Sequence, residues 1–206
     1  MAIGCQRLAP GPEPLSPGPV AEWHRHRRIR VPIELPGGGA PSLAVLAASL
    51  ERPERPLRAL LAPERLEGPA GDPEGPALFL YRSAPFRLLG LRLMPELRFE
   101  AIGGAGRLHL VSRGCRIEGL GRWREAVRFR LEATLSPYEA GVERGVEGVA
   151  AVALISSLVG WDPGRRLGER ALDQVLERIE RRLRRGLGRG AGRWLVSSGP
   201  NPGPSG

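Results

Sequence analysis

Proline limits where this chain can form regular structure more than any other residue, and its distribution is uneven. Of the 21 prolines, sixteen lie at or before Pro95, three lie in the last seven residues, and only Pro137 and Pro163 fall between. Proline interrupts helices and removes a hydrogen bond from a sheet. The sequence therefore predicts that most of the regular core lies in the second half of the chain.

Composition sets the expected domain plan. The chain has 206 residues, of which 29 are glycine and 21 are proline, a share at which part of a chain is expected to stay unfolded. The segment around residues 9–20 is especially rich in proline and glycine. We expect a flexible arm over residues 1–24, a single domain over 25–195 and a disordered tail over 196–206.

The first part of the expected domain mixes extended and helical patterns. Residues 28–35 alternate weakly and predict a first strand, which Pro32 would confine to a sheet edge or a bulge. Leucine spacing over 42–66 predicts short helices broken at Pro53 and Pro56. Residues 67–76, rich in glycine and proline, predict a loop.

After this loop the hydrophobic period changes from helical to alternating, which indicates an antiparallel sheet. The segment at 123–135 alternates most cleanly, with apolar residues on one face and charged residues on the other, so one face is expected to be buried and the other solvated. The clearest hairpin turn lies at 103–106. The strands are predicted at 77–82, 86–93, 96–102, 107–118, 123–135 and 143–155.

The last regular segment is an amphipathic helix that follows residues 161–164 and stops at a run of alternating glycines over 186–192. Its apolar stripe comprises Leu172, Val175, Leu176, Ile179, Leu183 and Leu187. This order of elements is that of an α+β, helix-grip (START-like) fold: a first strand, short helices, a meander of strands and a long last helix. In this fold a curved antiparallel sheet wraps around the C-terminal helix, and the wrap encloses an apolar cavity.

Three motifs within this pattern resemble a known family. They are PFRLLGL at 85–91, LMP at 93–95 and LVSRGC at 110–115, followed by a helix that ends near Trp194. The chain, over about residues 40–195, is similar to a family of uncharacterised cyanobacterial and chloroplast proteins (a domain of unknown function) in the START-like (SRPBCC) superfamily. Two departures are Ser156-Ser157 where a proline is expected and the run at 190–193. The resemblance implies a cyanobacterial cytoplasm and pigment or lipid handling near photosynthetic membranes.

The predicted function is a non-enzymatic binding or carrier protein for an apolar small molecule, lipid-like or pigment-like, held between the sheet and the last helix. With only 5% aromatic residues, and with small residues crowding 145–153, the concave face of the sheet is expected to be underfilled and to leave room for a ligand. The candidate ligand-binding residues are Leu97, Phe99, Leu108, Leu110, Phe129, Leu131, Leu176 and Ile179.

The alternative function rests on charge. All 31 basic residues are arginine, and the net charge of +9 is concentrated in two segments, 22–30 and 165–193. On the last helix the candidate anion-binding residues Arg178, Arg181, Arg182 and Arg185 are expected on one face, opposite the leucine stripe. This face would suit an adaptor that binds an anionic surface, namely membrane headgroups, RNA or an acidic protein. Nucleic acid is disfavoured because no aromatic side chain is interleaved to stack bases.

The competing interpretation of this Arg face is a solvated helix surface. Glu177 with Arg181, and Glu180 with Arg184, stand four residues apart in the order that stabilises a helix through ion pairs.

Other site classes find little support in the sequence. Cys5 and Cys115 form no disulfide framework, and Cys115 is too far along a strand from His109 to act with it as nucleophile and base. His24 and His26 could share one face of a strand, but arginines flank them and no further ligand joins them. We expect no metal and no cofactor. An enzyme of the cyclase or hydrolase type, sometimes found on this fold, is the weakest of the three functional interpretations, because no convergent set of polar residues can be assembled. Without a signal peptide or a membrane-length apolar run, we expect a cytoplasmic protein.

Overall fold

The computed structural model describes residues 21–35, 37–70, 75–88, 90–121, 124–157, 164–188 and 194–195. Of the predicted N-terminal arm, residues 1–20 lie outside the described residues, as does the predicted tail over 196–206. The remaining four residues of the predicted arm, 21–24, belong to the first strand.

One antiparallel sheet makes up most of the described structure, in the strand order β1-β8-β7-β6-β5-β3-β2, with β4 paired to β5. Its members are β1 (Ala21–Pro32), β2 (Leu66–Ala70), β3 (Ala77–Arg82), β4 (Phe86–Leu88), β5 (Leu91–Gly104), β6 (Arg107–Glu118), β7 (Val127–Ala140) and β8 (Glu143–Ser156). The helices are α1 (Leu43–Leu50), α2 (Glu54–Leu60), the short 3₁₀ turn η1 (Pro63–Arg65) and α3 (Gly164–Leu183), which continues as a π-helical turn, η3 (Arg184–Gly188).

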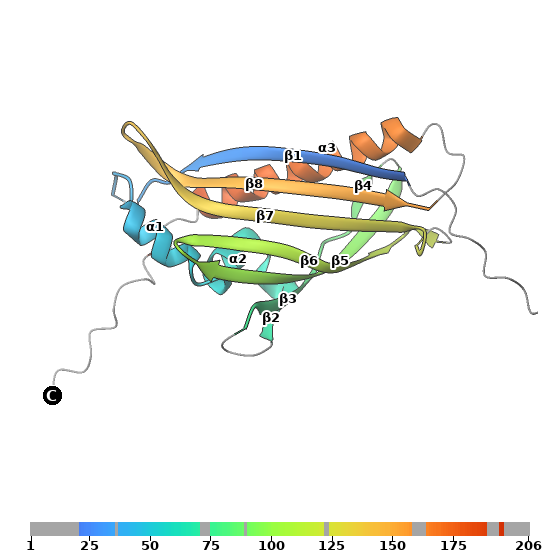
Figure 1. The fold of residues 1–206 in the computed structure, drawn as a ribbon, viewed down its shortest axis with the longest axis horizontal. Coiled ribbons are helices and arrows are strands. Elements are labelled where there is room, and N and C mark those ends of the chain that lie inside the picture. The colour runs from blue at the N-terminus through green and yellow to red at the C-terminus, as the bar shows by residue number, and fades with distance from the viewer. Residues whose placement is uncertain are drawn as a thin grey trace, which may run out of the picture.

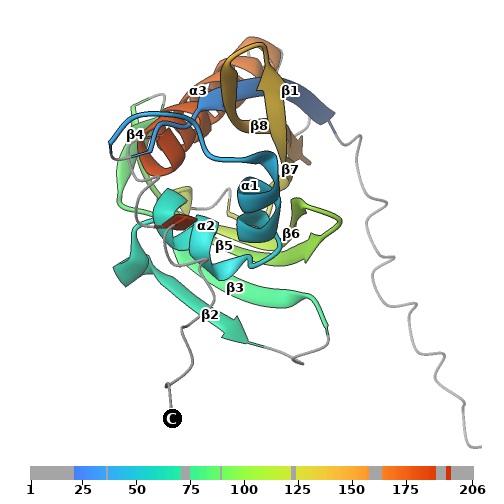
Figure 2. The same ribbon diagram turned by 90° about the vertical axis from the view of Figure 1, so that its left-hand side faces the viewer.

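The sheet is strongly curved, and α3 crosses its concave side. Figure 1 shows the long strands running side by side with α3 behind them, and Figure 2, seen from one end, shows the sheet as an open C with α1 and α2 at that end. This is the predicted α+β helix-grip architecture, a curved antiparallel sheet around the C-terminal helix. The fold class is therefore confirmed.

A β-bulge in β6 contributes to the curvature. Arg98 pairs with Gly114 and Phe99 pairs with Ser112, so Arg113 is an extra residue without a partner in the ladder. Its guanidinium instead lies 2.5 Å from the carboxylate of Glu100. A bulge bends the strand and increases its twist.

The bulge also changes which residues of β6 face inward. Before it, the even-numbered Leu110 and Ser112 line the concave side, and after it the odd-numbered Cys115 and Ile117 do so.

Close contacts and ion pairs fix α3 against the edge strand β1. A Cβ at Gly168 would lie only 2.9 Å from the Trp23 ring, which shows how closely the helix approaches the strand there. Arg25 Nη2 lies 3.0 Å from Glu169 Oε2, and Arg27 Nη1 lies 3.2 Å from Glu180 Oε2. These inward-facing arginines of β1 are therefore neutralised by acids of α3.

The main hydrophobic core lies between one end of the sheet and the short helices. Leu46, Leu50 and Leu57 are buried there against residues of β1, β3, β5 and β8, and Leu187 of η3 joins them. A second cluster packs α3 on β8. Residues of both clusters, together with α3, border a cavity between them.

The element boundaries differ from the prediction in several places. Predicted strand 86–93 is a hairpin of β4 and the start of β5, in which Phe86 pairs with Leu93. The predicted loop over 67–76 contains most of β2, which adds to β3 at the sheet edge. Pro56 lies inside α2, in its first turn, where its missing amide hydrogen removes no helical hydrogen bond. Pro32 does lie on an edge strand, as predicted.

Candidate functional site

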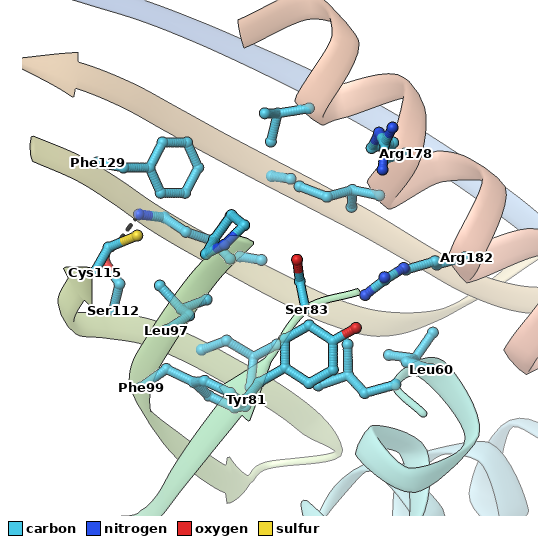
Figure 3. A pocket seen from close by; sticks show the side chains of 18 of the residues that line it. Leu60, Tyr81, Ser83, Leu97, Phe99, Ser112, Cys115, Phe129, Arg178 and Arg182 are labelled. Carbon is cyan, nitrogen blue, oxygen red and sulfur yellow. Dashed lines mark hydrogen bonds between the residues drawn. The ribbon is translucent and has the colours of Figure 1, made fainter. Parts of the chain in front are cut away.

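A cavity of about 260 Å³ lies between the concave face of the sheet and α3. The central strands supply one wall, α3 supplies the opposite wall, and Leu57, Leu60 and Leu61 close the end at α2 (Figure 3). Small residues help to make the space, because Ala133, Gly148 and Ala150 line it where larger side chains would fill it. The side chains of the two clusters pack around this space without filling it.

Six of the eight predicted ligand-binding residues line this cavity: Leu97, Phe99, Leu110, Phe129, Leu131 and Ile179. Leu108 and Leu176 do not line it, and they are packed within the two core clusters with 0% and 1% of their surfaces exposed. Ligand contact by these residues stays a prediction.

The bulge places two polar side chains in the wall. Ser112 Oγ accepts a hydrogen bond of 2.8 Å from the Leu131 amide, which ties β6 to β7 at the point where regular pairing stops (Figure 3). Cys115 also lines the cavity, and burial raises the pKa of its thiol to about 12. At neutral pH it is therefore a neutral thiol. Gly114 is the feature of the sequence that could have predicted this bulge and the change of inward-facing residues, since a glycine inside a strand often marks a bulge.

His109 is separated from Cys115 by this reversal of faces. Its Nδ1 lies 3.0 Å from Thr134 Oγ1 and its Nε2 lies 3.6 Å from Glu132, a side chain of the exposed face. Because the bulge turns Cys115 toward the cavity, the two side chains lie on opposite faces of the sheet.

Arg178 and Arg182 are the charged side chains among the described residues of the cavity lining. The Arg178 guanidinium carbon lies 4.0 Å from the centroid of the Phe86 ring, and that of Arg182 lies 5.2 Å from the centroid of the Tyr81 ring. Burial lowers the pKa of Arg178 from its ordinary value, and the charges of Arg181 and Arg182 lower that pKa further.

The four predicted anion-binding arginines therefore do not share one solvent face. Arg178 and Arg182 flank the apolar stripe and reach the cavity, whereas Arg181 and Arg185 are exposed. Arg181 Nε contacts the backbone oxygen of Glu177 at 3.4 Å, so its expected ion pair is replaced by a backbone contact. The expected pair of Glu180 with Arg184 is formed at 3.0 Å.

The other predicted basic segment, 22–30, is largely neutralised. In addition to the contacts of Arg25 and Arg27 with α3, Glu147 on β8 lies 3.7 Å from Arg28 and 2.7 Å from Arg30. This segment offers less free positive charge than its composition suggests.

The described part of the chain lacks two features. No group of three or more His, Cys, Asp or Glu side chains is arranged there to hold a metal ion. None of the helices there combines the length and the apolar character needed to cross a bilayer.

No protein-family model matches the chain, and no curated protein matches its sequence. Among solved structures, it is similar to the Zhui aromatase/cyclase from Streptomyces sp. R1128, with 12% identity, 87% of this chain and 93% of that chain covered, and a TM-score of 0.44. It is also similar to Ara h 8.0201, with 10% identity, 86% of this chain and 99% of that chain covered, and a TM-score of 0.43.

A START superfamily protein from Mycobacterium smegmatis is also similar, with 10% identity, 79% of this chain and 94% of that chain covered, and a TM-score of 0.38. The assignment of this chain to the helix-grip fold comes from its own topology, a curved antiparallel sheet wrapped around a C-terminal helix.

Proposed function

We propose that this protein binds or carries an apolar small molecule, lipid-like or pigment-like, in the cavity between the sheet and α3. The observation that carries the proposal is the cavity itself, an apolar space of about 260 Å³ inside the fold. Ligand pockets are mostly apolar hollows with a few polar groups, and the volume lies just below their usual range of about 300–1,000 Å³. The proposed ligand is accordingly small.

The composition of the lining supports binding by apolar contact. Leucine, phenylalanine and alanine side chains of the central strands face leucine, valine and isoleucine side chains of α3. An empty apolar cavity costs stability because its lining lacks contacts on one side, so a ligand that fills it restores those contacts. Occupancy should therefore raise the melting temperature.

A cavity-filling variant tests this function. Naphthalene, a neutral probe, should bind the wild type, and Ala133→Leu, which adds carbon atoms to the cavity wall, should weaken its binding about tenfold or more. Ala151→Leu is the matched control, since Ala151 is exposed on the neighbouring strand and should leave binding unchanged. Native mass spectrometry of the purified protein should also reveal a bound small molecule. No uptake of the probe and no co-purified molecule would refute the proposal.

A second candidate function is an adaptor that uses the exposed part of the Arg face. Arg181 and Arg185 are exposed and one turn apart, and no described carboxylate lies within 4.0 Å of either guanidinium. Reversing both to Glu should abolish binding to anionic vesicles, and binding by the wild type should fall steeply with salt. If the wild type fails to bind such vesicles at low salt, this function is excluded.

We further propose a relationship to the family of uncharacterised cyanobacterial and chloroplast proteins. It rests on the motifs at 85–91, 93–95 and 110–115, whose described residues contribute β4, the start of β5 and the bulged part of β6. This relationship implies that the ligand is a pigment or a lipid and that the protein is cytoplasmic.

A further inference from the structure

The cavity is apolar, but α3 brings two positive charges to it. Arg178 and Arg182 stand four residues apart, so they lie one above the other on the helix, and both line the cavity. In Figure 3 they extend from α3 on the side of the cavity where Tyr81 and Ser83 lie. Their guanidinium groups lie over the rings of Phe86 and Tyr81, at 4.0 Å and 5.2 Å from the ring centroids.

Neither charge is balanced by an acid in the described part of the chain. No described carboxylate lies within 4.0 Å of Arg178 or Arg182, whereas Glu169, Asp173 and Glu180 of α3 lie on its other flank. There Glu169 and Asp173 meet Arg25, and Glu180 meets Arg27 and Arg184. The helix therefore has one flank of paired charges, against β1, and one flank of unpaired positive charges, at the cavity.

The two guanidinium groups also keep unused hydrogen-bond donors. Each guanidinium carries five N–H donors, and a contact with the face of a ring uses its plane and leaves the N–H edges free. No hydrogen bond joins either group to another described residue. The lowered pKa of Arg178 is consistent with partial burial of a charge without a counter-ion. An oxyanion with two oxygen acceptors matches the geometry of such donors.

Cavity volume limits the size of the apolar part. A cavity of about 150 Å³ holds one benzene molecule, so the 260 Å³ found here holds on the order of ten non-hydrogen atoms. A medium-length alkyl chain or a pair of fused rings has this size.

Building on the proposed function, we propose that the ligand is an amphipathic carboxylate, with its apolar body in the cavity and its carboxylate held by Arg178 and Arg182. The cavity walls recognise the apolar body, and the two guanidinium groups recognise the head group. The aromatic rings of Phe86 and Tyr81 hold these groups in place before the ligand arrives, which lowers the entropic cost of binding.

Calorimetric titration of the full chain with a series of octyl compounds tests this proposal. Octanoate should bind about tenfold or more tightly than octanol, because only the carboxylate brings a negative charge and two acceptor oxygens to the guanidinium groups. Octylamine should bind more weakly than octanol, because its charge is repelled by the two arginines. Octyl phosphate separates the two oxyanions: preference for it over octanoate by tenfold or more would overturn the assignment of a carboxylate.

Variants locate the head group. Arg178→Gln together with Arg182→Gln should lower octanoate affinity to that of octanol while octanol affinity stays within about twofold. The matched control, Arg181→Gln with Arg185→Gln, removes the same charge from exposed positions of the same helix and should retain the preference for octanoate. Melting temperatures of both variants close to that of the wild type ensure that the comparison reports on binding.

The outcomes separate this inference from the function on which it rests. Equal binding of octanol and octanoate would refute the carboxylate site and leave an apolar carrier. An equal loss of octanoate binding in both double variants would show that net charge, and not the cavity, attracts the ligand, and would also refute the site. No binding of octanol, octanoate or naphthalene would refute the proposed function itself.

Discussion

Two phenylalanines of the same sheet allow the presence of the cavity to be tested as a difference in stability. Phe79 is 3% exposed, stacks on Phe99 with the ring centroids 5.6 Å apart, and does not line the cavity. Phe129 is half-buried and lines it. Truncation of an enclosed phenylalanine to alanine costs about 3–5 kcal/mol, and the lost stacking places Phe79→Ala toward the top of that range.

Phe129→Ala should cost much less, because one side of the ring already faces an empty space. The void that truncation would leave exists in part, so the cost reduces to the transfer of the ring from water, about 1.5–3 kcal/mol. We therefore expect Phe79→Ala to destabilise the protein by about 2–3.5 kcal/mol more than Phe129→Ala, a difference between two identical chemical changes.

Urea unfolding followed by circular dichroism measures this difference, provided that the slope of the unfolding free energy with denaturant is the same in all three proteins. Phe129→Ala should also admit larger apolar probes than the wild type. Equal costs within about 0.5 kcal/mol, both in the core range, would mean that the space beside Phe129 is filled by side chains in solution. The reasoning from an open cavity would then be refuted.

Two further predictions concern α3 and the cavity wall. Gly168→Ala should destabilise the protein by about 1–3 kcal/mol, although alanine favours helices, because the new Cβ would lie 2.9 Å from the Trp23 ring. Thermal melting measures the change in stability, with the substitution Gln174→Ala at an exposed position of α3 as the control. A Gly168→Ala variant more stable than the wild type would contradict the close approach of α3 to β1. Cys115 should resist alkylation by iodoacetamide in the native protein at pH 8, since a pKa of about 12 leaves the thiolate fraction near one in ten thousand. Peptide mapping by mass spectrometry measures this, and rapid labelling of Cys115 before unfolding would show that the thiol is exposed or activated.

The sequence predicts this fold well where the apolar and polar residues alternate. The strand at 107–118 and the hairpin at 103–106 occur as predicted, because the side chains follow a two-residue period on each side of the bulge and the glycines permit the turn. The first strand was predicted too short, from residue 28. Its earlier inward positions are Arg25 and Arg27, and nothing in the local pattern shows that acids of α3 neutralise them.

The candidate site is harder to predict because it depends on neighbours far apart in the sequence. A helical projection places Arg178 and Arg182 beside the apolar stripe, but it does not show that Phe86 and Tyr81 approach that flank. Similarly, Leu108 and Leu176 have the same pattern as the residues that line the cavity. Only the packing of α1 and α3 distinguishes a filled part of the concave face from an empty one.

The bulge at Arg113 has an evolutionary consequence. Because Arg113 is the extra residue of β6, its deletion would restore regular pairing with β5 while Ser112, Cys115 and Ile117 all kept their inward positions. A deletion elsewhere in the strand would shift the register and exchange inward for outward side chains. At this one position a descendant protein can change length and straighten the sheet, and thereby reshape the cavity, without altering the side chains that line it. Selection can therefore act on cavity shape and cavity chemistry separately.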